Sequence, residues 1–159
     1  MVLDDFLQIN SDELISCLEN YQQDLVRALI AASDEDFNKA ADKWLSATPS
    51  NTVQFGGEHK QPSIFREKIF EEVEKFICGS DEGRYDSARE ELNKQGDMTK
   101  EAIISVMSAA IGGVIGVAGA FIAPVIVLIL LSIGKIVKNA WCETRKALKA
   151  QTIENKNIV

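Results

Sequence analysis

The sequence predicts an all-α protein in which a small amphipathic helical head is followed by a long hydrophobic helical hairpin. In the first 97 residues, apolar side chains recur at steps of three and four, which is the period of one face of a helix. No segment shows the alternating apolar and polar pattern of a half-buried strand. Residues 102–134 then run for 33 positions without a charged side chain. We therefore divide the chain into a head (1–97), a hairpin (98–150) and a flexible tail (151–159).

Two helices are predicted in the first half of the head. The first spans 11–31, with Ser11 as its cap. Its buried face is expected to carry five apolar residues, Leu14, Leu18, Tyr21, Leu25 and Leu29. The second helix is expected to begin at Ser33, because Ser33 and Asp36 have the spacing of a capping box.

Two further helices are predicted in the second half of the head. They follow segment 48–62, whose prolines and paired glycines are typical of a loop. The third helix should cover 63–78, with an apolar buried face and with Glu72 and Glu74 directed to water. A short fourth helix is expected near 85–95.

The apolar run is expected to fold into two limbs, 100–118 and 124–148, with a break between Gly119 and Pro124. Small residues recur every four positions along the first limb, whereas the second limb is rich in Val, Ile and Leu. Small side chains at this spacing let helix backbones approach closely in lipid, and proline is favoured in the first turn of a helix. The residues predicted to form the helix contact and the turn are Ser108, Gly112, Gly113, Gly116, Gly119, Ala120 and Pro124.

The length of the apolar run favours two short passages into a bilayer over a single crossing. A straight helix of 33 residues reaches about 50 Å, whereas the hydrocarbon core is about 30 Å thick. An aromatic residue and several cations follow the run, as at a cytoplasmic membrane interface. The predicted interface residues are Trp141, Lys135, Lys138, Arg145 and Lys146. Since the amino terminus lacks the features of a signal peptide, we expect a protein of the cytoplasmic membrane with both termini in the cytoplasm.

Charge is divided unevenly along the chain. Residues 1–101 contain 22 acidic and 11 basic side chains, and residues 102–159 contain 2 acidic and 6 basic ones. A surface this acidic repels phosphates, so we expect no nucleic-acid partner. The acidic head is instead a candidate surface for a protein partner.

Metal, cofactor and catalytic signals are weak. The three cysteines, Cys17, Cys78 and Cys142, are far apart, which is typical of a reducing cytoplasm and argues against a disulfide framework. Cys142 also stands where a palmitoylated cysteine can stand. With one histidine, His59, and no ligand-spaced cluster, we expect no metal and no cofactor. An enzyme that uses His59 remains a third hypothesis, but His59 has no recognisable catalytic partner, so we do not expect an enzyme.

The uncharged, Gly/Ala/Ile/Val-rich stretch Ala102–Gly134 resembles the hydrophobic hairpin of pore-forming colicins. In that family the hairpin lies inside a bundle of amphipathic helices and later enters a membrane. The arrangement is also similar to small bacterial defence effectors, which join a soluble head to a few transmembrane helices. The resemblance implies a toxin-like protein that depolarises or permeabilises a membrane.

These patterns predict a membrane-associated, non-enzymatic effector. Its Gly-rich hairpin would anchor, oligomerise or permeabilise, and its acidic head would regulate the hairpin. The expected partners are the lipid bilayer and further copies of the chain. The alternative is a soluble all-α adaptor or immunity-type binding protein in the cytoplasm, with the hairpin buried as its core or as a subunit interface.

Overall fold

The computed structural model describes residues 2–46, 62–80, 82–94 and 98–158. In these ranges the chain forms α-helices and no strand, which confirms the predicted all-α class. In chain order the helices are α1 (Val2–Phe6), α2 (Ser11–Ile15), α3 (Asn20–Ala32), α4 (Phe37–Ser46), α5 (Pro62–Cys78), α6 (Asp86–Lys94), α7 (Lys100–Ile115), α8 (Gly119–Ile133) and α9 (Lys138–Ile158).

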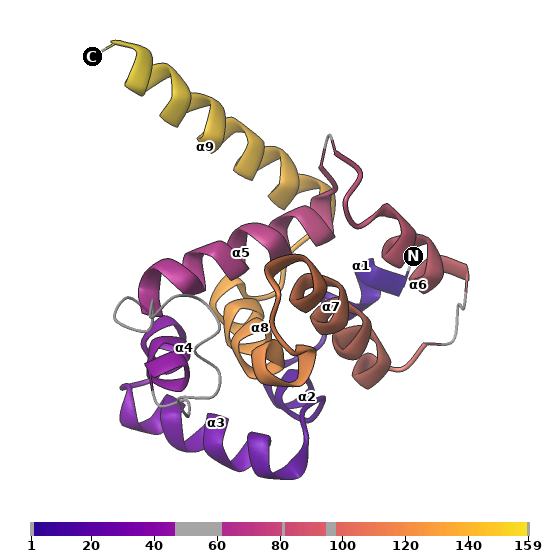
Figure 1. The fold of residues 1–159 in the computed structure, drawn as a ribbon, viewed down its shortest axis with the longest axis vertical. Coiled ribbons are helices and arrows are strands. Elements are labelled where there is room, and N and C mark those ends of the chain that lie inside the picture. The colour runs from indigo at the N-terminus through magenta and orange to yellow at the C-terminus, as the bar shows by residue number, and fades with distance from the viewer. Residues whose placement is uncertain (1, 47–61, 81, 95–97, 159) are drawn as a thin grey trace.

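Helix α8 lies in the middle of the molecule, and α2, α4, α5 and α7 pack against it (Figure 1). Every residue of α8 from Ile122 to Leu131 is buried. One continuous cluster of buried side chains joins the amino-terminal helices to α7 and α8. The expected order of a head (1–97) followed by a separate hairpin (98–150) is therefore not confirmed, because the hairpin supplies the centre of the core.

The predicted first helix, 11–31, is in fact two helices. Helix α2 ends at Ile15, and α3 begins at Asn20 after Glu19, whose backbone N–H donates to Oε1 of Gln22 (3.3 Å). The break shifts the helical register, so the buried face of α3 carries Gln22, Val26 and Ile30. Two residues predicted to be buried, Tyr21 and Leu25, are instead exposed.

The cap of the second predicted helix is also displaced. The side chain of Asp36 accepts a hydrogen bond from the backbone N–H of Lys39 (3.1 Å), so α4 begins at Phe37. Ser33, the predicted cap, ends α3. Asp34 and Glu35 between them have positive φ, and this left-handed pair reverses the chain.

Helix α5 confirms the third predicted helix, but two of its acidic residues are buried rather than directed to water. Glu72 accepts hydrogen bonds from the hydroxyl of Tyr85 (2.7 Å) and from Arg84 (2.9 Å). Burial raises the pKa of Glu72, yet these hydrogen bonds and nearby Lys75 outweigh it and hold the pKa below its ordinary value. Glu74 is likewise buried, and its partners lie on α9.

A disulfide joins Cys78, at the end of α5, to Cys142, in the first turns of α9, with the Cα atoms 5.6 Å apart. The expectation of unpaired cysteines is wrong for these two, because the fold brings together residues 64 positions apart. Beyond this link α9 projects away from the body of the molecule (Figure 1). The predicted second limb, 124–148, is therefore two helices, and the predicted flexible tail, 151–159, is helical up to Ile158.

The buried carboxylate of Glu72 predicts a dependence of stability on pH. Because its pKa is lowered in the folded state, it stabilises the fold above the unfolded value of about 4.3, and this contribution is lost as the pH falls through the folded pKa. We expect Glu72→Gln to reduce the free energy of unfolding by about 1–3 kcal/mol at neutral pH and to weaken the acid dependence. Urea unfolding at a series of pH values measures both effects.

The matched control is Glu71→Gln, since Glu71 is the exposed neighbour of Glu72. This variant should unfold like the wild type at every pH. Equal losses in the two variants would contradict a specific role for the buried carboxylate.

Candidate functional site

The candidate site is the hairpin formed by α7 and α8. The chain bends by 112° between these two helices. Helix α7 ends at Ile115, and Gly116 follows with a left-handed backbone (φ 80°). The N–H groups of Gly116 (2.8 Å) and Val117 (2.9 Å) both donate to the carbonyl oxygen of Gly112. The turn predicted between Gly119 and Pro124 thus lies earlier, because Gly116 is the residue that readily adopts this backbone conformation.

Gly112 and Gly119 allow the close approach of the two limbs that the sequence predicts. A Cβ added to Gly112 would collide with the carbonyl oxygen of Val117, and one added to Gly119 would lie 3.1 Å from the backbone of Ser108 and Ala109. Ser108 itself is buried, and its hydroxyl has no hydrogen-bond partner among the described residues. These positions pack backbone against backbone and leave no room for a side chain.

Pro124 does not begin a limb but lies inside α8, where it is buried. Proline has no backbone N–H, so the carbonyl of Ala120, four residues earlier, lacks its helical donor. The side-chain amide of Gln22, on α3, donates to that carbonyl (2.9 Å). Next to it, the indole N–H of Trp44 donates to the carbonyl of Phe121 (3.1 Å).

Gln22 and Trp44 were not singled out by the sequence as functional. A buried proline in an apolar helix does signal a carbonyl in need of a donor, but only the fold identifies that donor. The side chain of Gln22 is buried, which is uncommon for glutamine. Its hydrogen bond to Ala120 explains this burial. The two side chains satisfy the backbone of α8 only while α3 and α4 cover it.

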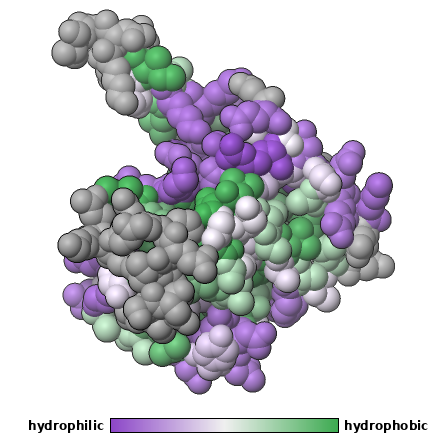
Figure 2. Space-filling view, in the orientation of Figure 1, coloured by the Kyte–Doolittle hydropathy of each residue, from purple (hydrophilic) through white to green (hydrophobic). Residues whose placement is uncertain are grey.

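The outer face of α7 is not covered. Ser105, Ala109 and Gly113 are exposed at intervals of four residues, and a Cβ on Gly113 would meet nothing within 4 Å. Val114, near the end of α7, is 43% exposed. Hydrophobic and weakly polar residues accordingly reach the surface in the middle of the face seen in Figure 2. One limb of the hairpin is therefore enclosed, while the other is half covered.

Two predicted interface residues, Trp141 and Arg145, dock against α5. The ring of Trp141 lies edge-on to Phe70 (6.5 Å between centroids), and the guanidinium of Arg145 lies over the same ring (5.1 Å). Arg145 (2.6 Å) and Lys149 also contact the carboxylate of Glu74. Burial alone raises the pKa of Glu74, but the hydrogen bonds from Lys149 and Arg145 hold it below its ordinary value.

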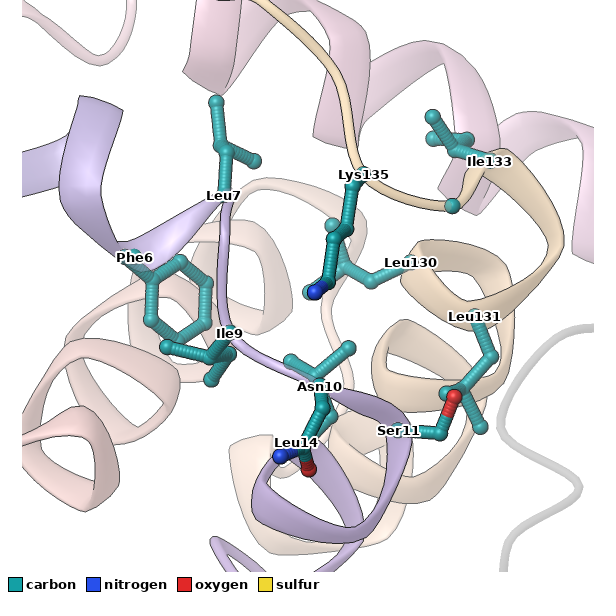
Figure 3. A pocket seen from close by; sticks show the side chains of 11 residues that line it. Phe6, Leu7, Ile9, Asn10, Ser11, Leu14, Leu130, Leu131, Ile133 and Lys135 are labelled. Atoms are coloured by element: carbon teal, nitrogen blue, oxygen red, sulfur yellow. The ribbon is translucent and has the colours of Figure 1, made fainter.

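The remaining predicted cations lie apart from this contact. Lys138 is the first residue of α9, and Lys146 lines a surface hollow beside the disulfide. Lys135 lies at a small pocket of about 130 Å³, between the carboxyl end of α8 and the chain from Phe6 to Leu14 (Figure 3). The pocket is mostly apolar, and Asn10 and Ser11 are the other polar residues that line it. The structure thus distributes the five predicted interface residues over different surroundings.

Two of the sequence predictions concern metal binding and catalysis. No cluster of three or more His, Cys, Asp or Glu side chains within them can hold a metal ion. His59, the basis of the enzyme hypothesis, lies outside the residues that the structure describes.

No protein-family model, curated protein or solved structure matches the chain. Among the described helices, none alone has the length and hydropathy to cross a bilayer, although α7 and α8 satisfy these criteria as a bent pair. The function of the hairpin therefore has to be inferred from its own geometry.

The close contact between the limbs predicts opposite effects at neighbouring glycines. Gly112→Ala and Gly119→Ala should each lower the free energy of unfolding by about 1–3 kcal/mol, because backbone atoms have to move apart. Gly113→Ala is the matched control and should raise it by about 0.5–1 kcal/mol, since alanine favours the helix and meets open space. Denaturant unfolding of the three variants measures the sign, and a loss at Gly113 equal to that at Gly112 would refute this packing.

A double-mutant cycle tests the role of Gln22. Gln22→Met should cost about 0.5–1.5 kcal/mol, because the carbonyl of Ala120 loses its donor at a part-buried position. In a Pro124→Ala background the helix regains an N–H at position 124 that can donate to this carbonyl, so the same change should cost about 1 kcal/mol less. Strict additivity of the two substitutions, measured by urea unfolding, would show that Gln22 does not compensate for Pro124.

Proposed function

We propose that this protein is a membrane-directed, non-enzymatic effector that keeps its hydrophobic hairpin, α7 and α8, wrapped by amphipathic helices until the hairpin enters a bilayer. The observation that carries the proposal is the burial of α8. From Ile122 to Leu131 this helix offers no polar side chain on any face, and it is covered on all sides. A helix that is hydrophobic all round belongs either to a protein core or to a membrane.

The geometry of the hairpin supports entry as a bent pair. Its turn, Gly116–Ala118, carries no charged side chain, and no charge occurs in either limb after Glu101. Insertion of the tip would therefore not require the transfer of a charge into the hydrocarbon region. The carbonyl of Ala120 lies close to this tip and loses the Gln22 amide when the tip enters the bilayer, so burial of the apolar limbs in lipid has to outweigh that lost hydrogen bond.

The exposed small-residue row of α7 supports self-association after insertion. Ser105, Ala109 and Gly113 face away from α8, whereas Ser108 and Gly112 face it. One row is therefore used within the hairpin, and the other is available to a second copy. Small residues at intervals of four are a frequent contact between helices in lipid. We place the effector at the cytoplasmic membrane, with a homo-oligomer as its active form.

A soluble all-α adaptor is the second candidate, and a specific observation favours it. Gln22 and Trp44 satisfy the carbonyls of Ala120 and Phe121 only in the wrapped state, as expected if that state is the functional one. Such an adaptor would use an exposed face for its partner. The exposed apolar residues of α3, Tyr21 and Leu25, lie beside acidic Asp24 and provide one such face.

Release of dye from lipid vesicles tests the proposal. Vesicles of phosphatidylethanolamine and phosphatidylglycerol should leak when the protein is added, and more strongly as the pH is lowered below about 4, through the lowered pKa values of Glu72 and Glu74, because protonation of these carboxylates removes their ion pairs. Val114→Lys should reduce leakage by about a hundredfold, since a charged side chain in an inserted helix costs about 2.5–3.5 kcal/mol at the bilayer centre. Val137→Lys is the control, because Val137 is 70% exposed and lies outside the hairpin.

Separation of vesicles from free protein by flotation distinguishes the two candidates. The effector should float with the vesicles under the conditions that cause leakage. If the folded protein remains in the dense fraction both at neutral pH and below about pH 4, and no dye escapes, the membrane proposal fails and the adaptor is favoured. Equal leakage from the Val114 and Val137 variants would show that the hairpin does not cause the leakage.

A further inference from the structure

The disulfide between Cys78 and Cys142 connects the helix that covers the core to the helix that follows the hairpin. Cys78 is the last residue of α5, and α5 packs against α7, α8 and α9. Cys142 lies nine residues after Ile133, the last residue of α8. The covalent loop closed by the bond therefore contains α6 and both limbs of the hairpin.

Few other contacts hold α9 to the body of the protein. The carboxylate of Glu74 contacts Arg145 and Lys149, and Phe70 contacts Trp141 and Arg145. The side chains of Arg145 and Lys149 are 31% and 50% exposed, although the Glu74 carboxylate between them is buried. The disulfide is the covalent constraint on the docked part of α9 and acts together with these ion pairs.

The disulfide lies at the edge of the core, where both cysteines are partly buried. Cys78 and Cys142 line a surface hollow of about 590 Å³, with Glu74, Glu82 and Glu143 and the cations Lys75, Arg145, Lys146 and Lys149 around it. The hollow brings solvent next to the two partly buried cysteines, which gives a reductant a route of approach. The third cysteine differs: burial, followed by the charge of Glu101, raises the pKa of the Cys17 thiol to about 12, so it stays protonated and unreactive at neutral pH.

We infer that the bond between Cys78 and Cys142 is a site of thiol–disulfide exchange with a dithiol reductant, and that its reduction frees α9 from α5. A thiolate of the reductant attacks one sulfur, and the other sulfur leaves as a thiolate and takes up a proton. The second thiol of the reductant, as a thiolate, then displaces the remaining cysteine. The disulfide gains two electrons and two protons, and the reductant becomes a disulfide.

The consequence for the hairpin rests on the proposed function. A cross-link removes conformational entropy from every state in which the loop that it closes has opened. The bond therefore favours the wrapped hairpin, and reduction shifts the balance toward release. Disulfides in a reducing cytoplasm are mostly transient or redox-sensing, which suits a bond that is broken for activation.

Hydrogen exchange of the intact chain, before and after treatment with dithiothreitol, tests the inference. In the oxidised protein, alkylation under denaturing, non-reducing conditions should modify only Cys17, and after reduction all three cysteines. Reduction should accelerate exchange of the backbone amides in 138–149 by about tenfold or more, because the docked turns of α9 open more often. Cys17→Ser is the matched control and should respond like the wild type, whereas the Cys78→Ser/Cys142→Ser variant should exchange rapidly with or without dithiothreitol.

The outcomes separate the inference from the proposed function. Three modifiable thiols in the untreated protein, or unchanged exchange of 138–149 after reduction, would overturn the redox site whatever the vesicles show. An increase in the exchange rate of 138–149 when the wild type is reduced, with no change when the Cys78→Ser/Cys142→Ser variant is treated in the same way, supports the redox site. If reduction frees α9 and the vesicles stay intact, the exchange site stands and the membrane proposal fails.

Discussion

The fold depends on one constraint, which is that an apolar helix without a polar face has to be covered on every side. Helix α8 carries large aliphatic side chains from Val125 to Leu131 and has no face that water can solvate. Burial of each such side chain contributes about 1.5–3 kcal/mol. The surrounding helices α2, α4, α5 and α7 need only one apolar face each, so their amphipathic sequences suit the role of a cover. The central position of α8 in Figure 1 follows from this difference.

Two backbone carbonyls at the start of α8 accept hydrogen bonds from side chains of the helices that cover it. Close contact at Gly112 and Gly119 removes space for side chains, and Pro124 removes a backbone donor. Gln22 reaches in from α3 to supply the missing hydrogen bond at Ala120, and Trp44 of α4 adds a second donor to the next carbonyl, that of Phe121. Each of these part-buried hydrogen bonds contributes about 0.5–1.5 kcal/mol, so they add to the preference for the wrapped state that the apolar packing provides.

The periphery is held by different chemistry from the centre. Two carboxylates on α5, Glu72 and Glu74, are buried with cations and a tyrosine that belong to later segments of the chain. They connect α5 to the segment before α6 and to α9, and the disulfide follows directly at Cys78. The apolar centre from Ile122 to Leu131 has no titratable side chain, whereas these outer connections contain two carboxylates of lowered pKa and the disulfide. In the proposed effector, these groups on α5 would control release of the hairpin.

The sequence by itself determined the helical class, the positions of α5 and α6, the existence of a long apolar run and the need for small residues at Gly112 and Gly119. These follow from local periodicity and from side-chain size. Tertiary structure alone decided that Tyr21 is exposed, that Glu72 and Glu74 are buried, and that Cys78 meets Cys142. The physical reason is that burial, pairing and cross-linking depend on partners between 12 and 75 positions away in the chain. Helical periodicity shows which side of a helix is apolar, but not which neighbour will cover it.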